Sequence, residues 1–128
     1  MTNQVTEEQQ QRRRRVLIVE NSAIMRGILH DIFSVLPHVE VVGEARDGVE
    51  ALEAIQKLHP DVMTLDIQMP RMGGLEVLQR MPKDHCQVIM LTGQADDFYQ
   101  KKCRELNAHH FFDKITEFNR FVEFVKVM

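Results

Sequence analysis

One carboxylate in this sequence stands where a strand is predicted to end. Asp66 directly follows the apolar run Val62–Leu65 and opens a turn rich in methionine, proline and glycine that extends to Gly74. A carboxylate at the exit of a buried strand loses hydration, so it needs cations or hydrogen-bond donors beside it. The side chains that meet Asp66 therefore decide what chemistry this position supports.

Three other apolar runs are also followed by polar side chains. They are Glu20–Asn21 after the first run, Thr92–Gly93 after the fourth and Asp113–Lys114 after the fifth. In an open parallel α/β sheet, ligands bind outside the carboxyl ends of the strands. We therefore expect these residues, which are distant in the sequence, to converge with Asp66 at one edge of a sheet.

The elements that must position these side chains alternate along the chain. Five runs that are mostly apolar throughout, as expected for strands covered on both faces, lie at Val16–Val19, Val39–Val42, Val62–Leu65, Val88–Leu91 and His110–Phe112. Amphipathic stretches between and after them predict helices at about 24–33, 51–58, 75–81, 95–106 and 116–127. Five βα units imply a parallel sheet with right-handed crossovers and helices on both faces, which is an α/β fold.

The first predicted helix carries two adjacent apolar rows. One row contains Ile24, Ile28 and Ile32, and the other contains Met25, Leu29 and Phe33. Either Asn21 or Ser22 is a suitable N-cap for this helix. Asn107 suits the left-handed position after the fourth helix.

Composition and length describe one soluble globular domain. The chain has 128 residues, of which 44% are hydrophobic and 27% charged. No stretch approaches the roughly 18 apolar residues of a bilayer span, and residues 1–8 lack the apolar segment of a secretory signal. Cys86 and Cys103 fit two buried thiols in a reducing compartment. We therefore expect a cytoplasmic protein without a membrane partner.

Residues 1–15 are polar and basic, and we expect them to be a disordered extension that precedes a folded domain at 16–128. Their run of arginines, Arg12–Arg15, is interpreted as a solvated lead-in to the first strand. Without the four Arg and two Glu of this extension, 12 basic side chains remain against 17 acidic ones, a net charge of −5. That charge argues against nucleic acid as the main ligand.

The region Val16–Met128 resembles the receiver domain of two-component response regulators. The most specific part is the sequence PDVMTLDIQMP at 60–70 with Gly73–Gly74 behind it, and VLIVENS at 16–22 and MLTG at 90–93 fit the same pattern. The sequences of these motifs look most like those of the receivers of chemotaxis regulators and methylesterases. The resemblance implies a flavodoxin-like (βα)5 doubly wound sheet of five parallel strands in the order 2-1-3-4-5.

The resemblance also implies phosphoryl transfer from a histidine kinase or phosphotransfer protein onto Asp66, with catalysis by positioning and charge neutralisation. Mg²⁺ would be held by Asp66, by the groups near Glu20 and Asn21, and by the backbone carbonyl of Gln68. The Lys114 ammonium would contact the phosphoryl group.

A switch is implied by the same resemblance. Thr92 would donate its hydroxyl to a phosphoryl oxygen, and Phe111 would turn inward as Thr92 moves. The fourth and fifth helices would then present an altered surface. We expect a partner or self-association surface, including a possible homodimer contact, that contains Phe98, Lys102 and Phe124.

Two positions depart from the family pattern. Asn21 stands where the family usually has a second acidic residue, which predicts magnesium affinity weaker by an order of magnitude or more. Ile115 stands where the family usually has proline after the lysine, so we expect a trans bond between Lys114 and Ile115.

These departures leave an alternative, a pseudo-receiver that binds a partner without being phosphorylated. An aspartyl phosphatase is disfavoured because Gln68 occupies the place of its second aspartate, and a flavin site lacks a phosphate-binding loop after the first strand. The six histidines show no metal-ligand spacing. We expect a single-domain regulator that is not an enzyme, apart from its own phosphorylation and dephosphorylation, and that signals to a downstream protein by contact.

Overall fold

The computed structural model describes residues 13–83 and 85–128. Strands and helices alternate along this part of the chain, in the order β1 (Arg14–Val19), α2 (Ala23–Ser34), β2 (Val39–Ala45), α3 (Gly48–Leu58), β3 (Val62–Leu65), α4 (Gly74–Arg80), β4 (Gln87–Thr92), α5 (Asp97–Glu105), β5 (His110–Asp113) and α6 (Phe118–Val127). The alternation confirms the βα units that the sequence predicts.

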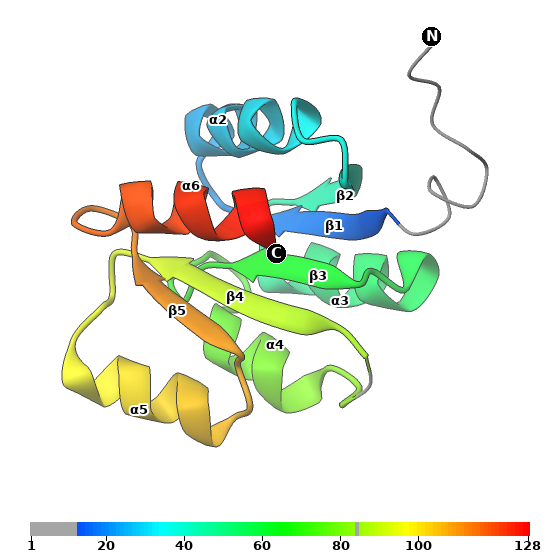
Figure 1. The fold of residues 1–128 in the computed structure, drawn as a ribbon. Helices are drawn as coiled ribbons and strands as arrows, with labels where there is room; N and C mark the ends of the chain where they lie inside the picture. Colours follow the sequence, from blue (N-terminus) through cyan, green and yellow to red (C-terminus); the bar gives the residue numbers. More distant parts are fainter. Residues whose placement is uncertain (1–12, 84) are drawn as a thin grey trace, which may run out of the picture.

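All strand pairs are parallel, and the sheet order is β2-β1-β3-β4-β5, as expected. Helices α2 and α6 cover one face of the sheet, and α3, α4 and α5 cover the other (Figure 1). The order places β1, β3 and β4 in the middle of the sheet. The chain segments that follow β1 and β3 therefore leave the sheet side by side, which is the requirement for a shared site.

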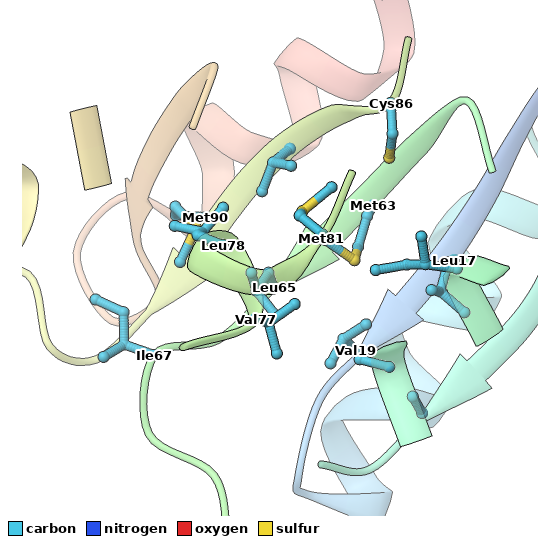
Figure 2. Packing of buried hydrophobic residues seen from close by; sticks show 14 of the residues in the cluster. Leu17, Val19, Met63, Leu65, Ile67, Val77, Leu78, Met81, Cys86 and Met90 are labelled. Atoms are coloured by element: carbon cyan, nitrogen blue, oxygen red, sulfur yellow. The ribbon is translucent and has the colours of Figure 1, made fainter. Parts of the chain in front are cut away.

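Each central strand contributes to two hydrophobic clusters because successive side chains point to opposite faces. In β1, Leu17 and Val19 belong to the cluster under α3, α4 and α5, whereas Val16 and Ile18 belong to the cluster under α2 and α6. Figure 2 shows the first cluster, which includes Leu17 and Val19 on β1 and Val77 on α4. Burial of each such side chain stabilises the fold by about 1.5–3 kcal/mol.

Helix α2 covers the sheet mainly with one of its two apolar rows, although Ile32 of the other row also packs on the same cluster. Leu29 and Phe33 are buried, and the Phe33 ring contacts Phe121 of α6 edge-on at 6.2 Å. In the other row, Ile24 is 80% exposed and Ile28 is 41% exposed. The fold therefore leaves isoleucines on the outer side of α2.

Caps set two helix starts. Ser22 is the N-cap of α2, where its hydroxyl accepts a hydrogen bond from Met25 N at 3.2 Å. Asp96 is the N-cap of α5, so this helix begins two residues after the predicted start at Ala95. Asn107 follows α5 with a φ of 69°, which confirms its left-handed position.

The predicted extension at 1–15 and the strand overlap by two residues. Residues 1–12 lie outside the described part of the chain, whereas Arg14 and Arg15 belong to β1. Arg14 donates to the Gln87 side chain at 2.5 Å, and Arg15 donates to the carbonyls of Leu58 and His59 at the end of α3. These two arginines are therefore part of the folded domain and not of a solvated lead-in. A cation at a helix C-terminus is favourable because carbonyl groups there lack partners.

Both cysteines are buried thiols, as the sequence predicts. Burial raises the pKa of the Cys103 thiol to about 11, so this group stays protonated at neutral pH. None of the helices in the described part of the chain has the length and apolarity of a bilayer span.

Candidate functional site

Asp66 lies directly beyond the carboxyl end of β3 and is buried, with 7% of its surface exposed. Its Oδ1 accepts a hydrogen bond from the Thr92 hydroxyl at 2.6 Å. Its Oδ2 accepts one from the Lys114 ammonium at 2.7 Å. Three segments that are distant in the sequence thus meet at one carboxylate, as the parallel sheet predicts.

Lys114 also binds a second carboxylate, so it bridges the ends of three strands. Its ammonium is 2.5 Å from Glu20 Oε1, and the other oxygen of Glu20 accepts from Ser22 N at 2.7 Å. Burial opposes the charge of Lys114, but hydrogen bonds and attraction from Asp66 and Glu20 outweigh it and raise the Lys114 pKa. The site therefore holds a resident cation shared by two buried acids.

We expect Lys114→Met to lower the free energy of unfolding at neutral pH by roughly 3 kcal/mol, because two buried carboxylates lose their partner. The folded-state pKa of Lys114 lies above its unfolded value of 10.5, so the contribution is complete below that value and is lost as pH rises through the folded-state pKa. Denaturant titrations of both proteins between pH 7 and 12 measure this difference. A gap that stays constant to pH 12 would contradict the assignment.

A cavity of about 610 Å³ opens above the Asp66 carboxylate. It is lined by Asn21, Asp66, Gln68, Met69, Pro70, Gly93, Gln94, Lys114 and Ile115. The Gln94 side-chain amide donates to the Gln68 side-chain oxygen at 2.7 Å, which links two walls of the cavity. The space admits an anion of phosphate size beside Asp66 and Lys114.

The oxygen ligands around this cavity suit a hard cation, but the cavity carries less negative charge than the family pattern supplies. Glu20, Asp66 and the carbonyl groups of Asn21 and Gln68 offer oxygen ligands, which Mg²⁺ prefers. Asn21 is exposed and neutral, and Lys114 already occupies one oxygen of each acid. Within residues 13–83 and 85–128, no group of three or more His, Cys, Asp and Glu is placed to hold a metal. The residues fit Mg²⁺ in donor type, with fewer carboxylates than the family pattern supplies.

The backbone after Lys114 follows a trans path, as expected. No peptide bond in the described residues is cis. Asp113 Oδ1 accepts from the backbone N–H groups of Ile115 and Thr116 at 2.8 and 3.2 Å, which holds the turn beyond the lysine. This turn explains why α6 begins at Phe118 rather than at Thr116.

The remaining predicted residues lie at the β5 edge of the sheet. Phe111 is half-buried and packs on the cluster under α5, whereas Phe112 packs on the opposite cluster. Phe98 and Lys102 line a shallow pocket on the exposed side of α5. Phe124 lies on α6 instead.

The Phe124 ring is partly buried against β5. It packs on His110 at 4.3 Å and on Phe112 at 5.6 Å. The structure thus groups Phe98 with Lys102 and places Phe124 in a separate aromatic cluster.

Sequence reasoning did not assign Gln94 or Arg71 to this region, and it named Ile115 only as a departure from the family pattern. Gln94 reaches across the cavity to Gln68, and Ile115 lines the cavity with 80% of its surface exposed. Arg71 of the turn after β3 pairs with Asp47 at 2.8 Å. Gln94, two residues after Thr92, and Ile115, directly after Lys114, had a signal in their positions, whereas Arg71 had none.

Comparison with known proteins identifies the fold and its relatives. The family model for the response regulator receiver domain matches residues 16–126. The response regulator domain of Thermotoga maritima CheB superposes with a TM-score of 0.81 at 35% identity, covering 89% of this chain and 91% of that one. A CheY in the CheX-CheY-BeF3-Mg+2 complex from Borrelia burgdorferi has a TM-score of 0.74 at 27% identity, covering 87% and 88%.

Curated relatives point in the same direction. A protein-glutamate methylesterase/protein-glutamine glutaminase of Pyrococcus abyssi is 52% identical over 102 residues, which are 77% of this chain and 28% of that protein. The corresponding protein of Geobacillus kaustophilus is 55% identical over 83 residues, or 64% of this chain and 24% of that protein. The chain thus spans about a quarter of the length of these relatives.

The names of these relatives correct one prediction. We expected a protein that is not an enzyme, whereas the relatives are named as methylesterases and glutaminases, which are enzymes. The prediction was wrong because it rested on the receiver pattern alone, and in these relatives the matched region is only about a quarter of an enzyme. Given the family match over 16–126 and the fold of its solved relatives, this chain belongs to the response regulator receiver family, with similarity to the CheB type.

Proposed function

We propose that Asp66 accepts a phosphoryl group from a phosphohistidine of a histidine kinase or phosphotransfer protein. A carboxylate oxygen of Asp66 attacks phosphorus, a P–O bond forms, and the P–N bond of the donor breaks with its electron pair leaving on the imidazole. The observation that carries the proposal is the buried Asp66 carboxylate, held by Lys114 and Thr92 at the floor of an open cavity. Transfer of label from a small phosphodonor to the protein tests it.

The same two side chains explain how the product is stabilised. Lys114 and Thr92 are donors that now contact the carboxylate at 2.7 and 2.6 Å. As the phosphoryl group joins Asp66, the ammonium and the hydroxyl are placed to donate to its oxygens instead, where they neutralise the added charge. Lys114 and Thr92 therefore serve before and after transfer through the same donor atoms.

Magnesium belongs to this proposal as a weakly held ion. The ligands would be Glu20, Asn21, Asp66 and the Gln68 carbonyl, and Mg²⁺ supplies positive charge that offsets the phosphoryl oxygens. The Borrelia burgdorferi CheY complex, whose name includes BeF3 and Mg+2, supports a site of this kind in a related receiver. In this chain Asn21 makes the ion weaker-bound than in a receiver with aspartate there.

The donor protein would dock on exposed isoleucines beside the cavity. Ile24 and Ile115 are each 80% exposed, and Ile28 is 41% exposed. Ile115 lines the cavity itself, and α2 begins directly after Asn21 and Ser22, the first of which also lines it. Apolar side chains at the rim favour a partner with an apolar face around its phosphohistidine.

The signal would leave through β5 and the helices beside it. Movement of Thr92 toward a phosphoryl group frees space next to β5, and Phe111 is the half-buried ring that turns inward. The relatives named as methylesterases support a protein-glutamate methylesterase activity as the downstream target that phosphorylation of Asp66 controls. The buried thiols of Cys86 and Cys103 suit a reducing cytoplasm as the compartment in which this happens.

We expect Phe98→Glu to weaken binding of the downstream protein, or self-association, at least tenfold, because an exposed aromatic anchor is replaced by a charge. Phe98 is 61% exposed and its ring contacts only Tyr99 among the described aromatic side chains, so the melting temperature should change little. Sedimentation and partner titration measure the effect, with Gln56→Glu, which adds the same charge at an exposed position on α3 outside this pocket, as control. Unchanged binding in Phe98→Glu would remove this residue from the surface.

A second candidate function follows from Lys114. It already neutralises Glu20 and Asp66 together, and Asn21 adds no charge, so a pseudo-receiver that binds partners without phosphorylation is compatible with the same atoms. Absence of label from a small phosphodonor, at millimolar magnesium, would favour this function over the first.

A further inference from the structure

The loop between β3 and α4 forms much of the wall around the phosphoacceptor. Asp66, Gln68, Met69 and Pro70 all line the cavity. The next residue, Arg71, has a backbone φ of 64°. A residue with a side chain adopts this left-handed conformation mainly where surrounding contacts hold it. The contacts that hold Arg71 therefore bear on the shape of the site.

Arg71 is held by a buried acid from another part of the chain. Its Nε donates to Asp47 Oδ2 at 2.8 Å, and the Asp47 side chain is 6% exposed. The other oxygen, Oδ1, accepts from Glu50 N at 2.9 Å, so Asp47 is also the N-cap of α3. Burial opposes ionisation of Asp47, but the hydrogen bonds from Arg71 and from backbone N–H groups outweigh it and lower its pKa. One ionised carboxylate thus joins the loop to the first turn of α3.

Backbone contacts reinforce this junction. Gly48 N donates to Met72 O at 2.9 Å, and a Cβ on Gly48 would lie 2.4 Å from that oxygen. Within the loop, Gly74 N donates to Ile67 O at 2.7 Å, and a Cβ on Gly74 would lie 2.1 Å from Asp66 O. The loop therefore folds back on the carbonyl of the phosphoacceptor itself, and its middle rests on α3.

The segment that carries Asp47 also touches the other half of the site. Ala45, the last residue of β2, accepts a hydrogen bond through its carbonyl from Glu20 N at 2.9 Å. Asp47 follows two residues later. This short connection from β2 to α3 therefore contacts both the strand end that carries Glu20 and the loop that carries Asp66.

We propose that Asp47 and Arg71 are positioning residues for phosphoryl transfer, acting as a clamp that holds the β3–α4 loop in the conformation that the reaction needs. Neither side chain contacts Asp66, so the effect passes through the loop. The inference rests on the proposed function of Asp66. When the clamp is broken, the loop populates other conformations, and the transfer rate falls with the fraction of molecules whose cavity wall is in place.

Two substitutions break the clamp while preserving the local fold. Arg71→Gly removes the guanidinium and introduces the residue that best tolerates a positive φ. Asp47→Asn removes the charge and keeps an N-cap side chain for α3. The matched control is Arg46→Ala, which breaks the exposed pair of Arg46 and Glu50 at the same helix start without touching the loop.

We expect the rate of labelling of Asp66 by acetyl phosphate to fall about tenfold in each clamp variant and to stay unchanged in Arg46→Ala. The double variant should be no slower than either single variant, because both remove the same interaction. Hydrogen exchange should accelerate locally, at the amides of Gly48, Met72 and Gly74, which bond within the loop or to it. Arg71→Gly leaves the buried Asp47 carboxylate without its cation and should also lower the melting temperature, whereas Asp47→Asn removes that charge and should change it less. A role confined to stability would instead accelerate exchange across the whole domain and slow labelling only in step with the loss of melting temperature.

Labelling rates unchanged in both clamp variants, or a general loss of protection, would overturn the inference. Failure of the proposed function gives a different result, because the unsubstituted protein itself would then take no label. In that case local exchange at Met72 and Gly74 still reports whether the clamp holds the loop.

Discussion

Asp66→Asn is expected to abolish transfer of label from a small phosphodonor, reducing the incorporated phosphate at least a hundredfold. An amide has no anionic oxygen to attack phosphorus and forms no acyl phosphate, while its shape preserves the cavity floor. The fold should persist, because Lys114 keeps its contact with Glu20 at 2.5 Å and the repulsion between two buried acids is removed. Phosphate incorporation with acetyl phosphate, followed by mass spectrometry of the intact protein, measures the loss.

The control for this experiment is Asp31→Asn, which removes an exposed carboxylate from α2 and leaves the cavity intact. Acyl phosphates are labile in alkali, so label on the unsubstituted protein should disappear on brief alkaline treatment. Label that persists in Asp66→Asn at the original rate would place the acceptor elsewhere. Label absent from every protein would support the pseudo-receiver in place of the phosphoacceptor.

Asn21→Asp is expected to tighten magnesium binding by at least ten times. Two unit charges about 4 Å apart interact by roughly 4 kcal/mol at an effective dielectric near 20, and a divalent ion feels more. Hydration of the added carboxylate and loss of the amide carbonyl return part of that energy, and a tenfold change needs only about 1.4 kcal/mol. Asn21 lines the cavity and is exposed, so the added carboxylate faces the cavity and remains in contact with water.

A charge added outside the cavity provides the comparison. Gly27 lies on the exposed side of α2, where a Cβ would meet no atom of another element within 4 Å. Gly27→Asp therefore raises the net negative charge by the same amount at a site that does not line the cavity. Calorimetric titration of Mg²⁺ into the three proteins gives the affinities. Equal affinities for Asn21→Asp and the unsubstituted chain would show that this position is not a ligand.

Asp66→Asn and Asn21→Asp test two different roles in the site, the nucleophile and a ligand of the cation. In the proposed reaction Asp66 supplies the attacking oxygen, whereas the Asn21 substitution changes only the charge available to a cation beside it. If phosphorylation of the unsubstituted chain needs high magnesium concentrations, Asn21→Asp should restore it at low ones. Lys114 pairs with both Glu20 and Asp66, so its charge stabilises these two acids in the absence of a metal ion.

The convergence of the site was predictable because it depends on a property that repeats along the chain. Apolar runs indicate strands, parallel strands place their carboxyl ends at one edge, and polar residues after those runs must therefore meet. Asp66, Thr92 and Lys114 are joined by hydrogen bonds in the structure for that reason. The strand order came from family resemblance and was then observed in the sheet.

Other features depend on how elements pack, which no local pattern contains. The α2 helix has two apolar rows of similar composition, and only contact with α6 shows that Leu29 and Phe33 are the buried ones. The pairing of Asp47 with Arg71 joins residues 24 positions apart, and neither lies in an apolar pattern. Its existence requires α3 and the β3–α4 loop to be in contact.

The sequence by itself determined the α/β class, the approximate positions of the five strands and five helices, and the identity of the carboxylate at the centre of the site. These follow from periodicity and residue type, which act over a few neighbouring residues. Only the tertiary structure decided that Lys114 is shared by Glu20 and Asp66, that Gln94 reaches Gln68, and that the loop rests on α3. Such contacts are fixed by distances between elements, because ion pairs and hydrogen bonds form only where packing brings their atoms within about 3 Å.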